Sequence, residues 1–244
     1  MSTSIQPAGE MLRLLDDKEC ARVSSRVRQL RKHWHQRNPK APFYTLGAAS
    51  YLDASAPGHD TRYRDLAQRL NPILWDAFGW LYKRLAKALE QQLEAPVRYD
   101  EHLALPGFHL FLAHPQWAKT VASIHIDQQY MNIDWSAFQI EGEMQAKQQI
   151  SLTLAIDLPA GGGGLRLWEI DRYQVLKLSR EERQSLRQKH SEPHFLAYHP
   201  GSLVVHSGHQ LHQIAPMPDM AENEQRLTLQ AHALPLREGW VVYW

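Results

Sequence analysis

The segment Ser123-Ile124-His125-Ile126-Asp127 organises this sequence, because it sets a histidine and a carboxylate two positions apart in a short β-branched run. Side chains at positions i and i+2 of a β-strand point to the same face of the sheet. We therefore expect His125 and Asp127 to project together from a strand, with Ile124 and Ile126 turned the other way into a core. Such a pair supplies two of the ligands that a metal site needs.

A third ligand must come from another part of the chain, and three histidines lie close together at His206, His209 and His212. The dipeptide Ser207-Gly208 interrupts this run, so strand parity alone does not choose among the three. Two histidines and one carboxylate on one face of an iron ion, with other coordination positions open, form the facial triad of non-heme Fe(II) oxygenases.

A second strand-like segment, Gln225-Arg226-Leu227-Thr228-Leu229, places an arginine and a threonine on one face and leucines on the other. The planar guanidinium group is suited to bidentate binding of a carboxylate. A buried sheet face that carries Arg226 needs an anion, and a free dicarboxylic acid would provide one. Thr228 would lie beside it.

The order of these motifs resembles the Fe(II)/2-oxoglutarate-dependent oxygenase superfamily: His125-x-Asp127, then His212, then Arg226-x-Thr228. The similarity covers roughly residues 106 to 234. It includes the glycine-rich turn at 161–164 and the Pro-Gly turn at 200–201, which precedes a hydrophobic run. The combination of motifs, rather than any single one, carries the resemblance.

The resemblance implies a mainly β fold with flanking helices, a double-stranded β-helix (a jelly roll, or cupin-like fold) buttressed by N-terminal helices. It implies Fe(II) bound by His125, Asp127 and His212, with 2-oxoglutarate held by Arg226 and Thr228, and O2 as the oxidant. The family places the distal ligand before a hydrophobic residue and a proline, which favours His212 and leaves His209 as the next candidate.

Asp127 indicates the type of reaction, because halogenases related to this superfamily carry a small residue in place of the carboxylate. Its presence favours hydroxylation of an unactivated C–H bond by a dioxygenase, although desaturation or cyclisation would use the same ligands. We expect a small-molecule substrate such as an amino acid or a related metabolite. Six residues are candidate substrate contacts, with core packing as the alternative for both tryptophans: Gln129, Tyr130, Trp135, Arg166, Trp168 and His209. The alternative functions are the same chemistry on a protein side chain or modified base, and a non-catalytic metal-binding jelly roll.

Composition limits the class of protein. The 244 residues carry a formal net charge of +1, with a sequence pI near 8.0, and this argues against a dedicated nucleic-acid binder. The single cysteine, Cys20, allows no internal disulfide and suits a reducing cytoplasm. The N-terminus lacks a signal-peptide pattern, and no run of 18 apolar residues predicts a membrane span. We expect a cytoplasmic protein without a nucleic-acid or membrane partner; the sequence does not indicate its oligomeric state.

We expect one domain over residues 1–244, in which a helical region (1–96) packs on a β core (97–244). Residues up to about Gly9 read as a loose tail. Apolar residues at helical spacing predict a helix from Asp17 to Arg37, and residues 38–58 read as irregular. The pair Asn71-Pro72 predicts an N-cap and first turn of a second helix that ends before Pro96.

Short β-like runs fill the rest of the chain, and many short strands with Gly and Pro turns indicate a sandwich or barrel. A helical or loop insertion is expected at about 170–191. The predicted strands are Phe108–Ala113, Thr120–Asp127, Gln149–Leu158, Leu165–Glu169, His194–Tyr198, Ser202–His206, His212–Ala215 and Arg226–Ala233.

Overall fold

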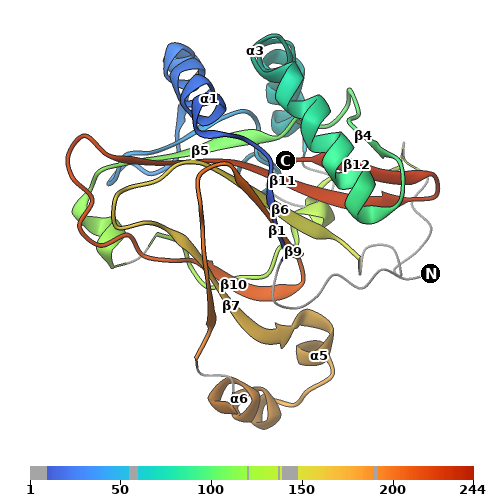
Figure 1. The fold of residues 1–244 in the computed structure, drawn as a ribbon. Helices are drawn as coiled ribbons and strands as arrows, with labels where there is room; N and C mark the ends of the chain where they lie inside the picture. The colour runs from blue at the N-terminus through green and yellow to red at the C-terminus, as the bar shows by residue number, and fades with distance from the viewer. Residues whose placement is uncertain (1–9, 55–59, 120, 137, 139–147, 190–191) are drawn as a thin grey trace.

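The structure is a computed structural model that describes residues 10–54, 60–119, 121–136, 138, 148–189 and 192–244. The expected tail before Glu10 lies outside the described residues. The described part of the chain contains two β-sheets, helices on one face of the larger sheet and further helices next to the smaller sheet (Figure 1).

Nine strands form the large sheet, and all but one of their pairings are antiparallel. Seven of them lie in the order β1 (Glu10–Arg13), β9 (Ser202–Ser207), β6 (Ile150–Asp157), β11 (Gln225–Leu236), β5 (Gly107–Leu112), β3 (Phe43–Leu46) and β2 (His35–Gln36). The remaining two extend the far end of β11, where β12 (Gly239–Tyr243) pairs with β11 and β4 (Val97–Arg98) pairs with β12 in parallel.

The small sheet contains β10 (Gln210–Ile214), β7 (Gly164–Asp171) and β8 (His194–Ala197) in that order. A reciprocal pair of backbone hydrogen bonds joins His125 to His212, so the segment around His125 takes a fourth position beside β10. From β5 to β11 the chain moves repeatedly between the large and the small sheet, which is the connectivity of a jelly roll. The predicted fold class, a double-stranded β-helix with flanking helices, is confirmed.

The predicted strand Thr120–Asp127 is wrong in its extent. His125 makes an isolated bridge, after which the chain enters the short helix η3 (Gln129–Asn132). Ile124 is 51% exposed rather than buried in a core, because no continuous ladder holds the segment in strand alternation. The backbone N–H of Asp127 instead donates to the carbonyl of Gly208 at 2.8 Å.

Two helices cover the outer face of the large sheet, α1 (Asp17–Gln29) and α3 (Thr61–Leu93) (Figure 1). A capping box of Asp16 and Glu19 fixes the start of α1. Buried leucines of α3 meet the leucines of β11 and β6 that point away from the small sheet, and these form the main core. No helix in the described ranges is long and apolar enough to cross a membrane.

Two predicted helix boundaries are wrong. The first helix ends at Gln29, and a single 3₁₀ turn, η1 (Arg31–His33), leads into β2. The second begins ten residues before Asn71, so Pro72 lies inside it. The Asn71 side chain does not cap the helix, because it bonds the backbone of Leu103 and Leu105. Buried apolar residues upstream of Pro72 outweigh the helix-breaking tendency of the proline.

The region predicted as irregular contains β3 and the short helix α2 (Ser50–Asp53). A buried bidentate ion pair between Arg37 and Asp53, with N–O distances of 2.8 and 2.7 Å, fixes this region. It carries Phe43 and Tyr51 to the wall of the cavity described below. The predicted insertion folds into α5 (Arg172–Leu176) and α6 (Arg180–Lys189), and a further turn, η2 (Pro115–Ala118), follows β5.

Gly107 on β5 allows Trp244 to pack against the sheet, since a Cβ at this position would lie 2.0 Å from the indole ring and 2.8 Å from the carbonyl oxygen of Leu46. We expect Gly107→Ala to lower the free energy of unfolding by about 1–3 kcal/mol through overpacking. Gly79→Ala is the matched control, because its Cβ meets ordinary contacts at 3.6 Å in mid-helix α3; it should stabilise by about 0.5–1 kcal/mol. Urea denaturation measures both, and equal effects would contradict this packing.

Candidate metal centre

A cavity of about 670 Å³ lies between the two sheets. One wall is the inner face of β5, β6, β9 and β11, and the opposite wall is formed by residues 121–132 together with β10 and the start of β7. Arg226, Gln230 and His232 occupy alternate positions of β11, so their side chains point to the same face of the sheet and line the cavity. The leucines between them point to the other face and pack in the core under the helices.

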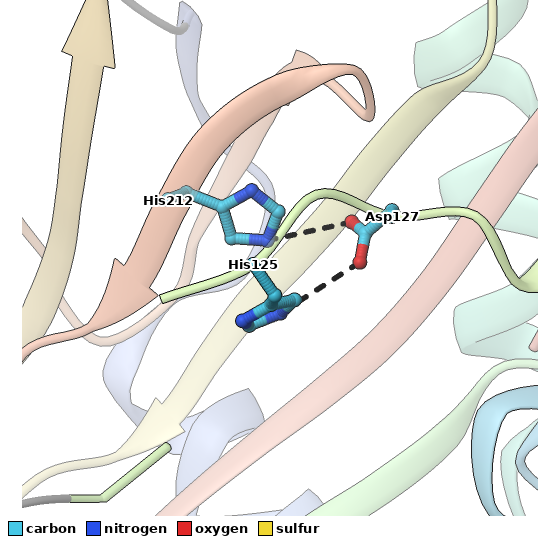
Figure 2. A group of neighbouring side chains, drawn as sticks. All are labelled: His125, Asp127 and His212. Carbon is cyan, nitrogen blue, oxygen red and sulfur yellow. Dashed lines mark ion pairs between the residues drawn. The ribbon is translucent and has the colours of Figure 1, made fainter. Parts of the chain in front are cut away.

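Three potential metal ligands converge in the wall of this cavity. His125 and Asp127 come from the segment that follows η2, and His212 comes from β10 (Figure 2). The Nε2 atom of His125 lies 3.8 Å from Oδ1 of Asp127, and Nε2 of His212 lies 3.5 Å from Oδ2. The three donor atoms all lie within 4.8 Å of one another, which suits a single bound ion.

Backbone carbonyls orient both imidazole rings. The Nδ1 atom of His125 lies 2.7 Å from the carbonyl oxygen of Ser123, and Nδ1 of His212 lies 2.8 Å from that of Gln210. Each Nδ1 must therefore carry the proton that it donates, which leaves the Nε2 lone pair free on the side of Asp127. Metal-binding histidines are commonly fixed in this way.

The protonation states also suit a metal ion. Burial works against the charged form of Asp127, but the surrounding histidines, His212 first among them, hold the pKa of its carboxyl far below the usual range. Burial lowers the pKa of His212 and of His232, and lowers the pKa of His206 to about 3. Asp127 is therefore ionised and His212 neutral, which are the forms in which a carboxylate and an imidazole bind a metal ion.

The other two candidate distal histidines lie near His212 but outside the triad. His206 lines the cavity, with its ring centroid 4.7 Å from that of His212, and its Nδ1 atom faces the carbonyl of Ser207. His209 is buried against the rings of Tyr130 and Tyr173 and does not line the cavity. Within the described ranges, no other three His, Cys, Asp or Glu side chains converge in this way.

Arg226 lies in the same cavity, and its side chain is fully buried. Its Nη1 atom lies 3.4 Å from Oγ1 of Thr228, and its guanidinium group packs over the rings of Phe111 and Tyr198 at 5.5 and 5.6 Å from their centroids. The Nε and Nη2 atoms have no hydrogen-bond partner among the described residues. Burial lowers the pKa of Arg226. A carboxylate is the group that would satisfy these two donors together.

Thr228 points to the same face of β11 as Arg226 and is fully buried, but it is not among the residues that line the cavity. Its hydroxyl oxygen accepts hydrogen bonds from Arg226 and from Gln230, whose Nε2 atom is 2.8 Å away. The hydroxyl group of Thr228 therefore helps to fix the position of the Arg226 guanidinium group.

Of the six candidate substrate contacts, the structure places only Gln129 on the cavity wall. Leu165 of β7 faces the cavity, so Arg166, at the opposite parity, faces away from it. Trp168 lies where the pairing of β7 with β10 shifts register, and it is buried but does not line the cavity. Trp135 packs on Phe138 and Tyr243. The other two candidates, Tyr130 and His209, contact each other outside the cavity lining.

Several cavity residues were not predicted from the sequence, and strand parity would have indicated some of them. His232 continues the series Arg226, Thr228, Gln230 on β11, and Ser151 lies opposite His232 on β6. His109 of β5 lies opposite Thr228, with its Nε2 atom 2.5 Å from the hydroxyl of Tyr51. Tyr51 gives no such signal, because it comes from a separate short helix.

No protein-family model matches the chain, and no curated protein is significantly similar to it.

Solved structures, in contrast, share its fold. An N-substituted L-amino acid dioxygenase from Burkholderia ambifaria superimposes with a TM-score of 0.53 at 13% sequence identity, over 96% of this chain and 85% of the dioxygenase. The complex of such a dioxygenase with α-ketoglutarate gives 0.51 at 16% identity, over 96% and 84%. The non-heme α-ketoglutarate-dependent epimerase SnoN from nogalamycin biosynthesis gives 0.53 at 13% identity, over 93% and 78%.

At these identities the similarity establishes the fold. The chain has the jelly-roll fold found in Fe(II)/2-oxoglutarate-dependent oxygenases, and the resemblance indicated by the sequence motifs is confirmed at this level.

Proposed function

We propose that the protein is an Fe(II)- and 2-oxoglutarate-dependent oxygenase that hydroxylates an unactivated C–H bond of a small molecule, such as an amino acid or a related metabolite. His125, Asp127 and His212 bind the metal. Arg226, held by Thr228, binds the remote carboxylate of 2-oxoglutarate. The amino acid dioxygenase with the same fold supports this substrate class.

One observation carries the proposal: the triad and an arginine with two unused buried donors share a single cavity. A buried donor without a partner costs about 1–3 kcal/mol, and more when it is charged. Among the described residues of the cavity wall, Asp127 is the only acidic side chain, and no described carboxylate pairs with Arg226. A dicarboxylic acid that reaches both the metal and Arg226 would supply such a carboxylate.

Bound Fe(II) with 2-oxoglutarate supplies the oxidising chemistry of this class, in which O2 delivers one oxygen atom to the C–H bond and the other to the succinate formed as CO2 leaves. The protein's own residues orient the reactants and restrict water. Phe111 and Tyr198 cover the guanidinium group, and Phe43, Tyr51 and Trp244 make much of the wall aromatic. Such a site strengthens the ionic contact with a carboxylate.

The test is succinate formation by the Fe(II)-loaded protein, measured with a panel of free and N-substituted L-amino acids. Stimulated succinate release together with a product that gains one oxygen atom supports the proposal. Stimulated release with loss of two hydrogens, or with inversion of a stereocentre, would replace hydroxylation by another oxidation. Metal binding without 2-oxoglutarate turnover for any compound would favour a non-catalytic metal-binding protein.

A further inference from the structure

The Asp127 carboxylate is not held by a strand, so other contacts must orient it. Its two oxygens accept hydrogen bonds from two different segments: Gln129 of η3 donates to Oδ1 at 2.9 Å, and the Ser151 hydroxyl of β6 donates to Oδ2. Ser151 is 5% exposed and lines the cavity. The orientation of the carboxylate therefore depends on side chains outside the triad.

Ser151 is itself held by a histidine. His232 lies opposite it in the ladder between β6 and β11, and its Nδ1 atom is 3.1 Å from the Ser151 oxygen. A serine hydroxyl carries a single proton. Since Ser151 gives that proton to Asp127, the contact with His232 is satisfied only if Nδ1 of His232 carries a proton and donates it to the serine oxygen.

His206 lies opposite Ser151 on its other side, in the ladder between β6 and β9. Its Nδ1 atom faces the carbonyl oxygen of Ser207 at 2.9 Å instead. Of the two histidines that flank Ser151, His232 is therefore the one that bonds the serine, which in turn donates to Asp127.

We propose that Ser151 and His232 are positioning residues of the metal centre: Ser151 orients the Asp127 carboxylate toward the two Nε2 atoms, and His232 acts through Ser151. This inference rests on the metal site of the proposed function. It assigns a role to two residues that do not bind the metal, and it predicts that their removal weakens metal binding in the absence of any substrate.

The experiment is a titration of the metal-free protein with Co(II), followed by the visible absorption of the bound ion. Loss of an outer hydrogen bond to a ligand costs about 10- to 100-fold in metal affinity, and we expect this loss for Ser151→Ala. Ser151→Thr retains the hydroxyl and should recover most of the affinity. His232→Leu should weaken binding, whereas His232→Asn, whose amide can donate from the position of Nδ1, should not.

The double variant Ser151→Ala/His232→Leu tests whether His232 acts through Ser151. It should bind Co(II) about as weakly as Ser151→Ala alone, because the hydrogen bond of His232 runs to the serine, whereas its Nδ1 atom lies 3.8 Å from Oδ2 of Asp127, beyond hydrogen-bond distance. Additive losses would mean that His232 acts independently, and they would overturn that half of the inference.

Thr153→Ala is the matched control. Thr153 lies two residues along the same face of β6, and its hydroxyl donates to Gln230 rather than to Asp127. It should leave Co(II) affinity unchanged. If Ser151→Ala fails to fold, as judged by near-UV circular dichroism without metal, Ser151→Val replaces it, with an apolar side chain that suits a strand and neither donates a hydrogen bond nor binds a metal.

The outcomes separate the two proposals. Wild-type affinity in Ser151→Ala, or equal losses in Ser151→Ala and Thr153→Ala, would overturn the positioning role and leave the metal site intact. Absence of Co(II) binding by the wild-type protein would overturn both this inference and the proposed function.

Discussion

Asp127→Ala is expected to abolish Fe(II) binding at micromolar concentrations. The substitution removes the only acidic side chain among the described cavity residues, and with it the charge that offsets the cost of bringing a divalent ion into a buried site. The loss should exceed the roughly 10- to 100-fold that an outer hydrogen bond contributes. Equilibrium dialysis under anaerobic conditions measures it.

The histidines provide the internal comparison for this result. His212→Ala should lose the metal as Asp127→Ala does, whereas His206→Gln and His209→Gln should retain most of the affinity, because neither ring belongs to the triad. Loss of the metal in the His209 variant alone would show that the distal ligand has been assigned to the wrong residue.

Arg226→Met is expected to weaken the binding of 2-oxoglutarate without weakening the binding of Fe(II). Methionine fills a similar buried volume without charge, so 2-oxoglutarate should bind at least about 100-fold more weakly, from loss of two charge-assisted hydrogen bonds worth about 1.5–3 kcal/mol each. Fe(II) affinity should stay close to that of the wild type, because no ligand is removed. Titration calorimetry with each ligand measures both.

The same variant should be more stable than the wild type when no ligand is present. The wild-type guanidinium group is fully buried with two donors unsatisfied, and replacing such a group by an apolar one removes a desolvation cost. Urea denaturation of the ligand-free protein measures this gain. A large loss of stability, or an equal loss of Fe(II) and 2-oxoglutarate affinity, would make Arg226 a structural residue.

Strand parity carried most of what the sequence predicted well. Polar and apolar side chains alternate along β11 and β6 because one face of these strands packs in the core under the helices and the other faces the cavity. This alternation predicted that Arg226 and the leucines beside it lie on opposite faces of the sheet. The choice of His212 as the distal ligand rests on the resemblance and stays a prediction, because three histidines within seven residues give no parity argument across the turn at Gly208.

Sequence reasoning failed where tertiary contacts override local patterns. The run from Ile124 to Asp127 reads as a strand, but a single bridge and a hydrogen bond to Gly208 hold it instead. Asn71-Pro72 reads as a helix start, yet upstream packing extends α3 through it. The substrate candidates failed to converge because Arg166 lies on the outward face of β7 and Trp168 lies where the pairing of β7 with β10 shifts register. Alternation alone could predict neither.

The most direct test of the central claim is an anaerobic titration of the metal-free protein with Fe(II) and then 2-oxoglutarate, followed by visible absorption. We predict a weak metal-to-ligand charge-transfer band that requires both additions, is lost in Asp127→Ala, and needs far more 2-oxoglutarate in Arg226→Met. Absence of the band in folded wild-type protein, or an unchanged band in Asp127→Ala, would contradict the assignment of this cavity as an iron and 2-oxoglutarate site.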